Sequence, residues 1–93
     1  MERTGAQILL EVLRQEGVDL IFGYPGGSVI PIFDTLYDAK DIRLILTRHE
    51  QGAGHMADGF ARASGRHGVV IGQNGPGISN CVTAIAAAYW AHS

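Results

Sequence analysis

The sequence has one cysteine, a nearly balanced charge and no long apolar run. Cys81 stands alone among 93 residues, which excludes an internal disulfide and fits a reducing compartment such as the cytoplasm. The net charge of −2 gives no electrostatic basis for binding nucleic acid or an anionic membrane surface. No apolar run reaches the roughly 20 residues that a membrane-spanning helix needs. The N-terminal residues read as an amphipathic segment and not as a signal peptide.

Glycine, in contrast, is abundant. It supplies 13 of the 93 residues, about twice its usual share of roughly 7%. The glycines form short clusters between apolar runs, a pattern that predicts tight turns where the backbone comes close to another group. The length allows one small domain, residues 1–93, and the sequence contains no linker, repeat or second domain.

Apolar periodicity predicts helices that alternate with short strands. Helices are expected at residues 4–16, 28–38, 50–64 and 77–91, and strands at residues 20–22, 42–47 and 69–71. Thr4 and Ser28 are the predicted N-caps, Pro31 fits a first helical turn, and Gly65 is expected to end the third helix.

This order predicts an α/β domain with a parallel sheet and helices on both of its faces, that is, three layers. After the last predicted helix the alternation calls for another strand. We therefore expect that the domain is truncated at Ser93 and that these residues are part of a larger unit.

Three turns follow the predicted strands, at residues 23–27, 48–52 and 73–77. The carboxyl ends of the strands in an open α/β sheet lie along one edge, where ligands bind, so we expect the three turns to meet at one site. The first and third turns carry no charged residue, and their glycines leave the backbone groups uncovered. Only the second turn brings ionisable groups to this edge.

Glu50, in the second turn, is the strongest candidate for a catalytic residue. An acid in the first turn of a helix often does no more than stabilise that helix, and on physical grounds this alternative has about equal weight. The neighbouring glycine and the two uncharged turns favour a cleft. Burial in such a cleft would raise the pKa of Glu50 and prepare it to share a proton.

Residues 23–27, 48–62 and 75–80 together resemble the N-terminal, pyrimidine-binding domain of thiamine-diphosphate (ThDP) enzymes of the acetolactate synthase group. The resemblance covers essentially the whole chain. It implies a flavodoxin-like fold in which Glu50 hydrogen-bonds a ring nitrogen of the cofactor's aminopyrimidine. This bond promotes loss of the thiazolium proton, and the resulting ylide attacks a 2-keto acid.

The resemblance also implies which residues lie around the cofactor. The expected cofactor-binding residues are Tyr24, Pro25, Gly26, Glu50, Gly75, Pro76 and Asn80. There are two alternatives to these cofactor contacts. Tyr24 could be an ordinary packed turn residue, and Asn80 could lie on a solvated helix face. The Gly75–Asn80 spacing as a degraded dinucleotide fingerprint is discounted, because its third glycine is absent.

Within the group, residues 20–48 look like biosynthetic acetolactate synthase, whereas residues 72–81 and 87–93 look more like sulfoacetaldehyde acetyltransferase. Gln73 and Asn74 stand where acetolactate synthases usually have a Thr-Ser step, so the substrate, a 2-keto acid or sulfoacetaldehyde, stays open. The resemblance further implies Mg²⁺ and the diphosphate bound by a separate domain that these residues lack, a homo-oligomer that shares the cofactor between subunits, and FAD in some members. The 93 residues alone are expected to be inactive.

Other interpretations predict different chemistry. There are two competing functional classes. One is a truncated module that only associates with other subunits, and the other is a small flavodoxin-like protein that binds a nucleotide or flavin. His49 and His55 do not share a helix face, so no metal site is expected among the histidines. Asp58 and Arg62 are expected to form a surface ion pair, and Cys81 to be a core residue.

Overall fold

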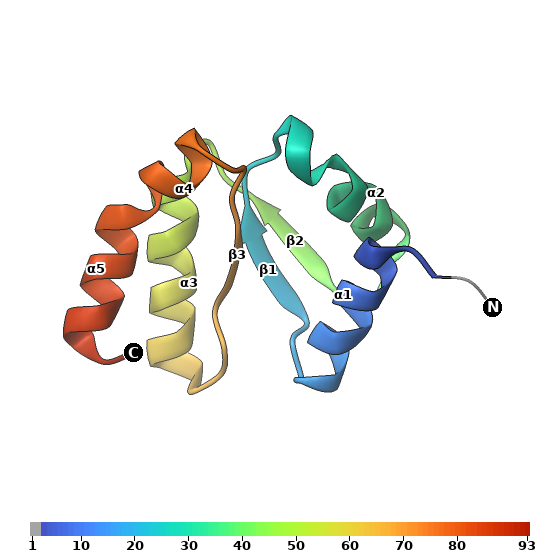
Figure 1. Cartoon of the computed structure of the whole chain (residues 1–93). Helices are drawn as coiled ribbons and strands as arrows, with labels where there is room; N and C mark the ends of the chain where they lie inside the picture. Colours follow the sequence, from blue (N-terminus) through green and yellow to red (C-terminus); the bar gives the residue numbers. More distant parts are fainter. Residues whose placement is uncertain (1–2) are drawn as a thin grey trace.

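The computed structural model describes residues 3–93, with the side chain of Ser28 left out. Helices and strands alternate as the apolar pattern predicts (Figure 1). The elements are α1 (Gly5–Gln15), β1 (Leu20–Gly23), the 3₁₀ turn η1 (Gly27–Val29), α2 (Ile30–Asp38), β2 (Arg43–Leu46), α3 (Glu50–Ser64), β3 (Val69–Ile71), α4 (Pro76–Asn80) and α5 (Val82–Ala91).

The three strands form one parallel sheet in the order β2-β1-β3. Phe22 in the central strand pairs with Ile45 on one side and with Val70 on the other. This order matches the first three strands of a flavodoxin-like fold, in which the chain reverses its direction of growth between β1 and β3. The predicted fold class is therefore confirmed. In Figure 1 the carboxyl ends of the strands lie at the top, where η1, α4 and the start of α3 gather.

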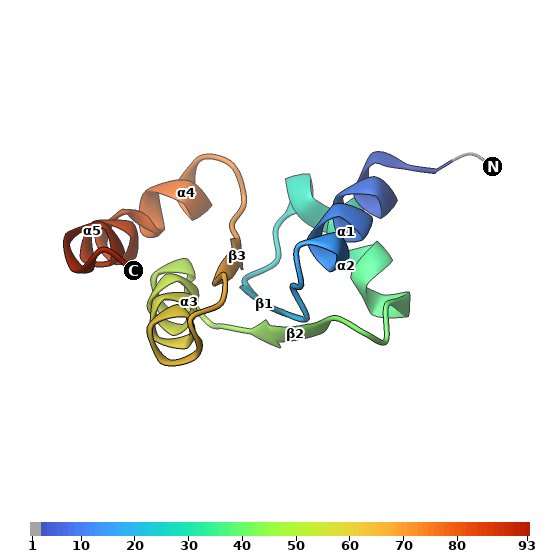
Figure 2. The same cartoon turned by 90° about the horizontal axis from the view of Figure 1, so that it is seen from below.

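Helices cover both faces of the sheet (Figure 2). On one face, α1 and α2 pack over a core of Leu10, Val18, Ile21, Leu36 and Ile42. On the other face, α3 packs Ala53 and Ala57 against Phe22, and the Phe60 ring meets Phe22 edge-on at a centroid distance of 6.2 Å. Helix α5 packs mainly against α3, on the side away from the sheet.

The ends of three helices follow local sequence rules. Thr4 accepts a bond from the Gln7 N–H, and the Gln7 side chain accepts one from the Thr4 N–H, which confirms the predicted cap and completes a capping box. Pro31 lies in the first turn of α2, and α3 ends at Gly65, both as predicted. Ser28 falls inside η1; its predicted capping side chain lies outside the described part, and Val29 is the residue that precedes α2.

The prediction of one helix at residues 77–91 is wrong in one respect. The segment forms two helices, α4 and α5, which meet at Cys81. The Cys81 N–H bonds back to the Ile78 carbonyl at 3.0 Å, a tighter turn than an α-helix makes. The Cys81 thiol also contacts the Glu50 carbonyl. Tertiary contacts of α4 with α3 therefore change the direction of a segment that its sequence alone predicts to be continuous.

Within residues 3–93, no helix is both long enough and apolar enough to cross a lipid bilayer. The longest, α3, has 15 residues.

Candidate functional site

The three predicted turns meet at the carboxyl edge of the sheet. The Thr47 N–H donates to the Gly23 carbonyl at 2.9 Å, and this bond joins the ends of β2 and β1. The Tyr24 N–H donates to the Ile71 carbonyl at 3.4 Å, which joins the ends of β1 and β3. The expectation that turns about 25 residues apart share one site is thereby confirmed.

Glu50 is the first residue of α3 and lies at this edge. His49 caps the helix: its Nδ1 accepts the Gln51 N–H at 3.0 Å. Glu50 is only 8% exposed, and it is the one ionisable residue among the buried residues that the structure describes apart from the Cys81 thiol. The buried carboxylate that the sequence predicts is present, and it also occupies the first turn, where a negative charge favours the helix.

Asn80 is the side chain that contacts the Glu50 carboxylate. Its Nδ2 donates to Oε1 of Glu50 at 3.1 Å across a separation of 30 residues. The alternative in which Asn80 lies on a solvated helix face is therefore wrong. The end of α4 turns this amide inward, so α3 and α4 present their polar groups to each other.

The expected rise in the pKa of Glu50 is wrong in direction. The bond from Asn80 and a further bond from its own backbone N–H lower the pKa of Glu50, and they outweigh the effect of desolvation. The nearby His49 contributes in the same direction. The prediction counted burial and left out the donors, although donors aimed at a carboxylate favour its charged form.

Two glycines allow backbone to approach this edge closely. A Cβ on Gly77 would lie 3.4 Å from Oε2 of Glu50 and 3.2 Å from the Gly72 backbone carbon. A Cβ on Gly26 would overlap the side-chain amide of Gln73. The absence of a side chain therefore lets the Gln73 amide lie against the Gly26 backbone and lets the Gly77 backbone lie close to the Glu50 carboxylate.

The remaining predicted residues lie on the same edge but at its surface. Tyr24 is 40% exposed, so part of its side chain is open to solvent. Pro25, Gly75 and Pro76 are exposed as well. All four follow the carboxyl end of β1 or of β3 at this edge of the sheet.

Sequence reasoning missed four residues that shape the site. They are Thr47, whose hydroxyl donates to the His49 carbonyl at 3.0 Å, His49 as the helix cap, Gln73 beside Gly26, and Cys81 against the Glu50 backbone. The position of Thr47 at the end of a strand was a usable signal. The other contacts join separate loops and leave no mark on local sequence pattern.

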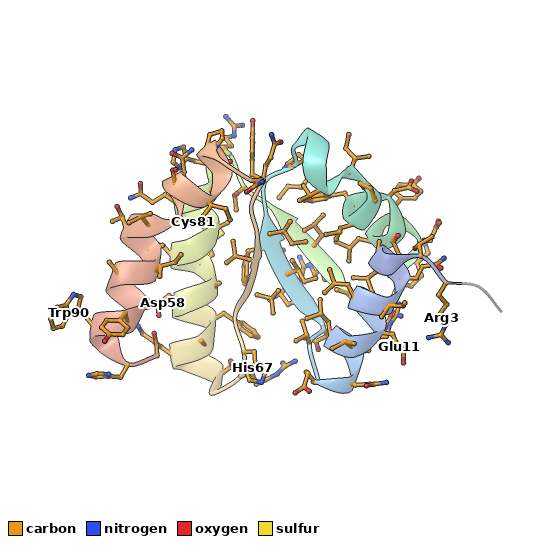
Figure 3. The ribbon with its side chains drawn as sticks, viewed as in Figure 1. Arg3, Glu11, Asp58, His67, Cys81 and Trp90 are labelled. Atoms are coloured by element: carbon orange, nitrogen blue, oxygen red, sulfur yellow. The ribbon has the colours of Figure 1, made fainter. Side chains whose placement is uncertain are left out.

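Cys81 is a core residue, as predicted, and is 5% exposed. Figure 3 shows its side chain under α4, beside the start of α3. Burial raises the pKa of the Cys81 thiol, and the neighbouring Glu50 charge adds to this effect. A thiol held in its neutral form is a poor nucleophile. Its role here is packing.

A hollow of the described surface lies away from Glu50. It measures about 610 Å³ and is bordered by α3, α5 and the segment that leads into β3. Asp58 lines it and pairs with Arg62 at 2.8 Å, so the predicted ion pair is confirmed. The Asp58 side chain is only 8% exposed and also contacts Ser93, and this carboxylate is therefore covered and not on the surface as expected. Within residues 3–93, no three His, Cys, Asp or Glu side chains are grouped as a metal site would need.

Comparison with known proteins gives matches that cover nearly the whole chain. The family described as "Thiamine pyrophosphate enzyme, N-terminal TPP binding domain" matches residues 3–93. The chain is 59% identical to the sulfoacetaldehyde acetyltransferase of Castellaniella defragrans over 99% of its own length. It is 58% identical to the probable acetolactate synthase large subunit of Methanocaldococcus jannaschii over 91% of its length, and 50% identical to the acetolactate synthase large subunit of Lactococcus lactis over 92%.

The chain spans only 14% to 15% of the length of these three relatives. The similarity therefore concerns one part of proteins about seven times longer.

Proposed function

Because this chain belongs to the family of N-terminal TPP-binding domains of thiamine pyrophosphate enzymes, we propose that Glu50 is the residue through which it activates the cofactor. Its carboxyl group would share a proton with a ring nitrogen of the cofactor's aminopyrimidine, so that a hydrogen bond joins the two. The remaining predicted residues, Tyr24, Pro25, Gly26, Gly75, Pro76 and Asn80, would border or support that ring.

One observation carries this proposal: a carboxylate that is 8% exposed lies where the carboxyl ends of three parallel strands meet. Ligands of open α/β sheets bind at this edge, where the strand order reverses. Here that place is between β1 and β3, next to Gly26 and Gln73.

The residues present fit an aminopyrimidine. The ring is flat and polar at its edge, and it needs a carboxylate partner together with backbone that can approach its face. Glu50 supplies the partner, and the glycine at position 77, whose Cβ would lie 3.4 Å from Oε2, supplies the room. The loops that follow β1 and β3 carry no charged side chain that would compete for the carboxylate.

When bound, thiamine diphosphate supplies the electron sink that carbon–carbon bond cleavage and formation require. The chain's own residues position the pyrimidine, exclude water and hold a proton at the Glu50 carboxyl. We propose that another part of the full-length protein holds the diphosphate and its Mg²⁺, since the chain spans only 15% of its relative's length. The reduced, buried Cys81 agrees with a cytoplasmic location.

For the full-length protein we propose carboligation of 2-keto acids, as in acetolactate synthase. The acetyltransferase that acts on sulfoacetaldehyde is the second candidate, since its 59% identity is as high as that of the archaeal synthase at 58%. An assay of the full-length protein with pyruvate alone, and with sulfoacetaldehyde together with inorganic phosphate as the acetyl acceptor, separates them by which compound is consumed. Absorbance of the purified protein shows whether FAD is present.

The substitution Glu50→Gln tests the central role. In the full-length protein it replaces the carboxylate with a neutral group of the same shape, so exchange of the thiazolium proton of bound ThDP should slow by about 10²- to 10⁴-fold, the usual contribution of acid–base catalysis. The measurement is NMR after quenched-flow mixing in D₂O, with Glu11→Gln at a half-exposed position of α1 as the control. Exchange at the unaltered rate in a folded Glu50→Gln protein would remove Glu50 from this role.

The same protein also tests the non-catalytic alternative. A module that only associates with other subunits would neither bind ThDP nor promote proton exchange, whatever residue stands at position 50. We further propose that the full-length protein is a homo-oligomer whose cofactor is shared between subunits, and sedimentation measured with and without ThDP checks this.

A further inference from the structure

The two oxygens of the Glu50 carboxylate have different surroundings. Oε1 accepts the Asn80 amide at 3.1 Å. Oε2 lies beside Gly77, where an added Cβ would be 3.4 Å away, and among the described residues no other side chain bonds to it. No fully buried side-chain oxygen or nitrogen in the described part lacks a partner, so Oε2 keeps access to the space at the sheet edge.

The backbone of α4 fixes the position of Asn80. The Ile78 N–H donates to the Gln73 carbonyl at 3.1 Å, and the Ser79 N–H donates to the Gly75 carbonyl at 3.0 Å. These bonds tie the start of the short helix to the loop after β3. Through these bonds, the loop holds the position of Asn80 at the end of α4, and with it the side-chain amide that contacts Glu50.

Two successive residues at the junction of α4 and α5 contact Glu50. Asn80 bonds the carboxylate, and the thiol of Cys81 lies 3.8 Å from the Glu50 carbonyl oxygen. One contact holds the side chain and the other holds the backbone of the same residue.

We propose that Asn80 is a positioning residue for Glu50: by holding Oε1 it leaves Oε2 as the oxygen that faces the aminopyrimidine. This inference rests on the proposed role of Glu50 and adds to it a division of tasks between the two oxygens. Asn80 then acts through the carboxylate and does not need to touch the cofactor.

The other titratable groups that face Glu50 are few. His49 precedes it and lowers its pKa, and the neutral Cys81 thiol lies on its backbone side. The amide of Asn80 makes the largest contribution to the lowered pKa of Glu50. Since an N–H donor stabilises the carboxylate and not the neutral acid, loss of this donor should raise the pKa of Glu50.

The test compares Asn80→Leu and Asn80→Asp with the matched control Ser79→Ala, which alters an exposed residue of the same helix. The Glu50 carboxyl is titrated by ¹³C NMR in the full-length protein without ThDP, and Glu50→Gln assigns its resonance. Both Asn80 variants should raise the pKa of Glu50, Asn80→Asp more so because it adds a second carboxylate. Ser79→Ala should leave it unchanged.

Binding of ThDP, measured by calorimetry with Mg²⁺, supplies a second measurement. Residues that orient a binding group typically contribute roughly 10- to 100-fold to affinity, so Asn80→Leu should weaken ThDP binding by about that factor through the displaced Glu50 carboxyl. An unaltered Glu50 pKa in either folded Asn80 variant would overturn the inference. If the pKa rises while Glu50→Gln leaves proton exchange unaffected, the Asn80–Glu50 contact stands and the proposed function is what fails.

Discussion

At the scale of single residues, three carboxylates of this protein have lowered pKa values for three different reasons. The Asn80 amide lowers the pKa of Glu50, the Arg14 guanidinium lowers that of Asp41, and the Ser93 hydroxyl followed by Arg62 lowers that of Asp58. Only Glu50 has a neutral partner at a ligand-accessible edge. The other two carboxylates bond to cations and contribute to the fold.

The Arg14–Asp41 pair predicts a dependence of stability on acid. Arg14 Nε lies 2.6 Å from Oδ2 and its Nη2 lies 3.1 Å from Oδ1, a two-pronged contact between α1 and the loop before β2. Because the pKa of Asp41 is lower in the folded chain than its usual 3.8, the pair stabilises the fold above that value. The stabilisation is lost as the pH falls through the folded pKa.

Urea unfolding between pH 7 and pH 2.5 measures this effect. Asp41→Asn should flatten the acid limb of the stability profile, while Asp34→Asn, at an exposed site on α2, should leave it as it is. A profile of Asp41→Asn that matches the parent protein would show that the pair contributes nothing.

At the scale of elements, burial decides what each helix contributes. In α1, Leu10 is 1% exposed while its neighbour Leu9 is 40% exposed. Both are good helix formers, so their effect on the helix itself is similar. Their difference in burial comes only from the face that α1 turns toward the sheet.

Leu10→Ala and Leu9→Ala form a matched pair for this point. Removal of the buried side chain should cost about 2–5 kcal/mol of unfolding free energy, whereas the exposed change should cost well under about 1 kcal/mol. Urea unfolding followed by circular dichroism gives both values. Equal losses would mean that α1 does not dock on the sheet as described.

At the scale of the whole molecule, the outer side of α5 is apolar and uncovered. Val82 and Ile85 are 59% and 60% exposed, and Tyr89 and Trp90 are 74% and 79% exposed. Figure 3 shows Trp90 pointing away from the rest of the chain. Helices that are apolar all round are normally buried, so the 93 residues by themselves leave this surface in water.

The fluorescence of Trp90 checks this exposure, since it is the only tryptophan. Acrylamide should quench the 93-residue chain at low concentration nearly as strongly as a free tryptophan derivative, because 79% of the residue is accessible. Weak quenching would place Trp90 in contact with other groups. A fall in quenching as the chain is concentrated would indicate association through α5.

The sequence by itself determined the alternation of helices and strands, the capping of α1 by Thr4, and Glu50 as the one ionisable candidate at the sheet edge. These features follow from periodicity, propensity and spacing, which are properties of neighbouring residues. Only the tertiary structure decided the direction of the Glu50 pKa shift, the break at Cys81 and the covered state of Asp58. Each depends on a donor or a packing partner at least 30 residues away, such as Asn80 for Glu50 and Ser93 for Asp58, and no local pattern encodes such a contact.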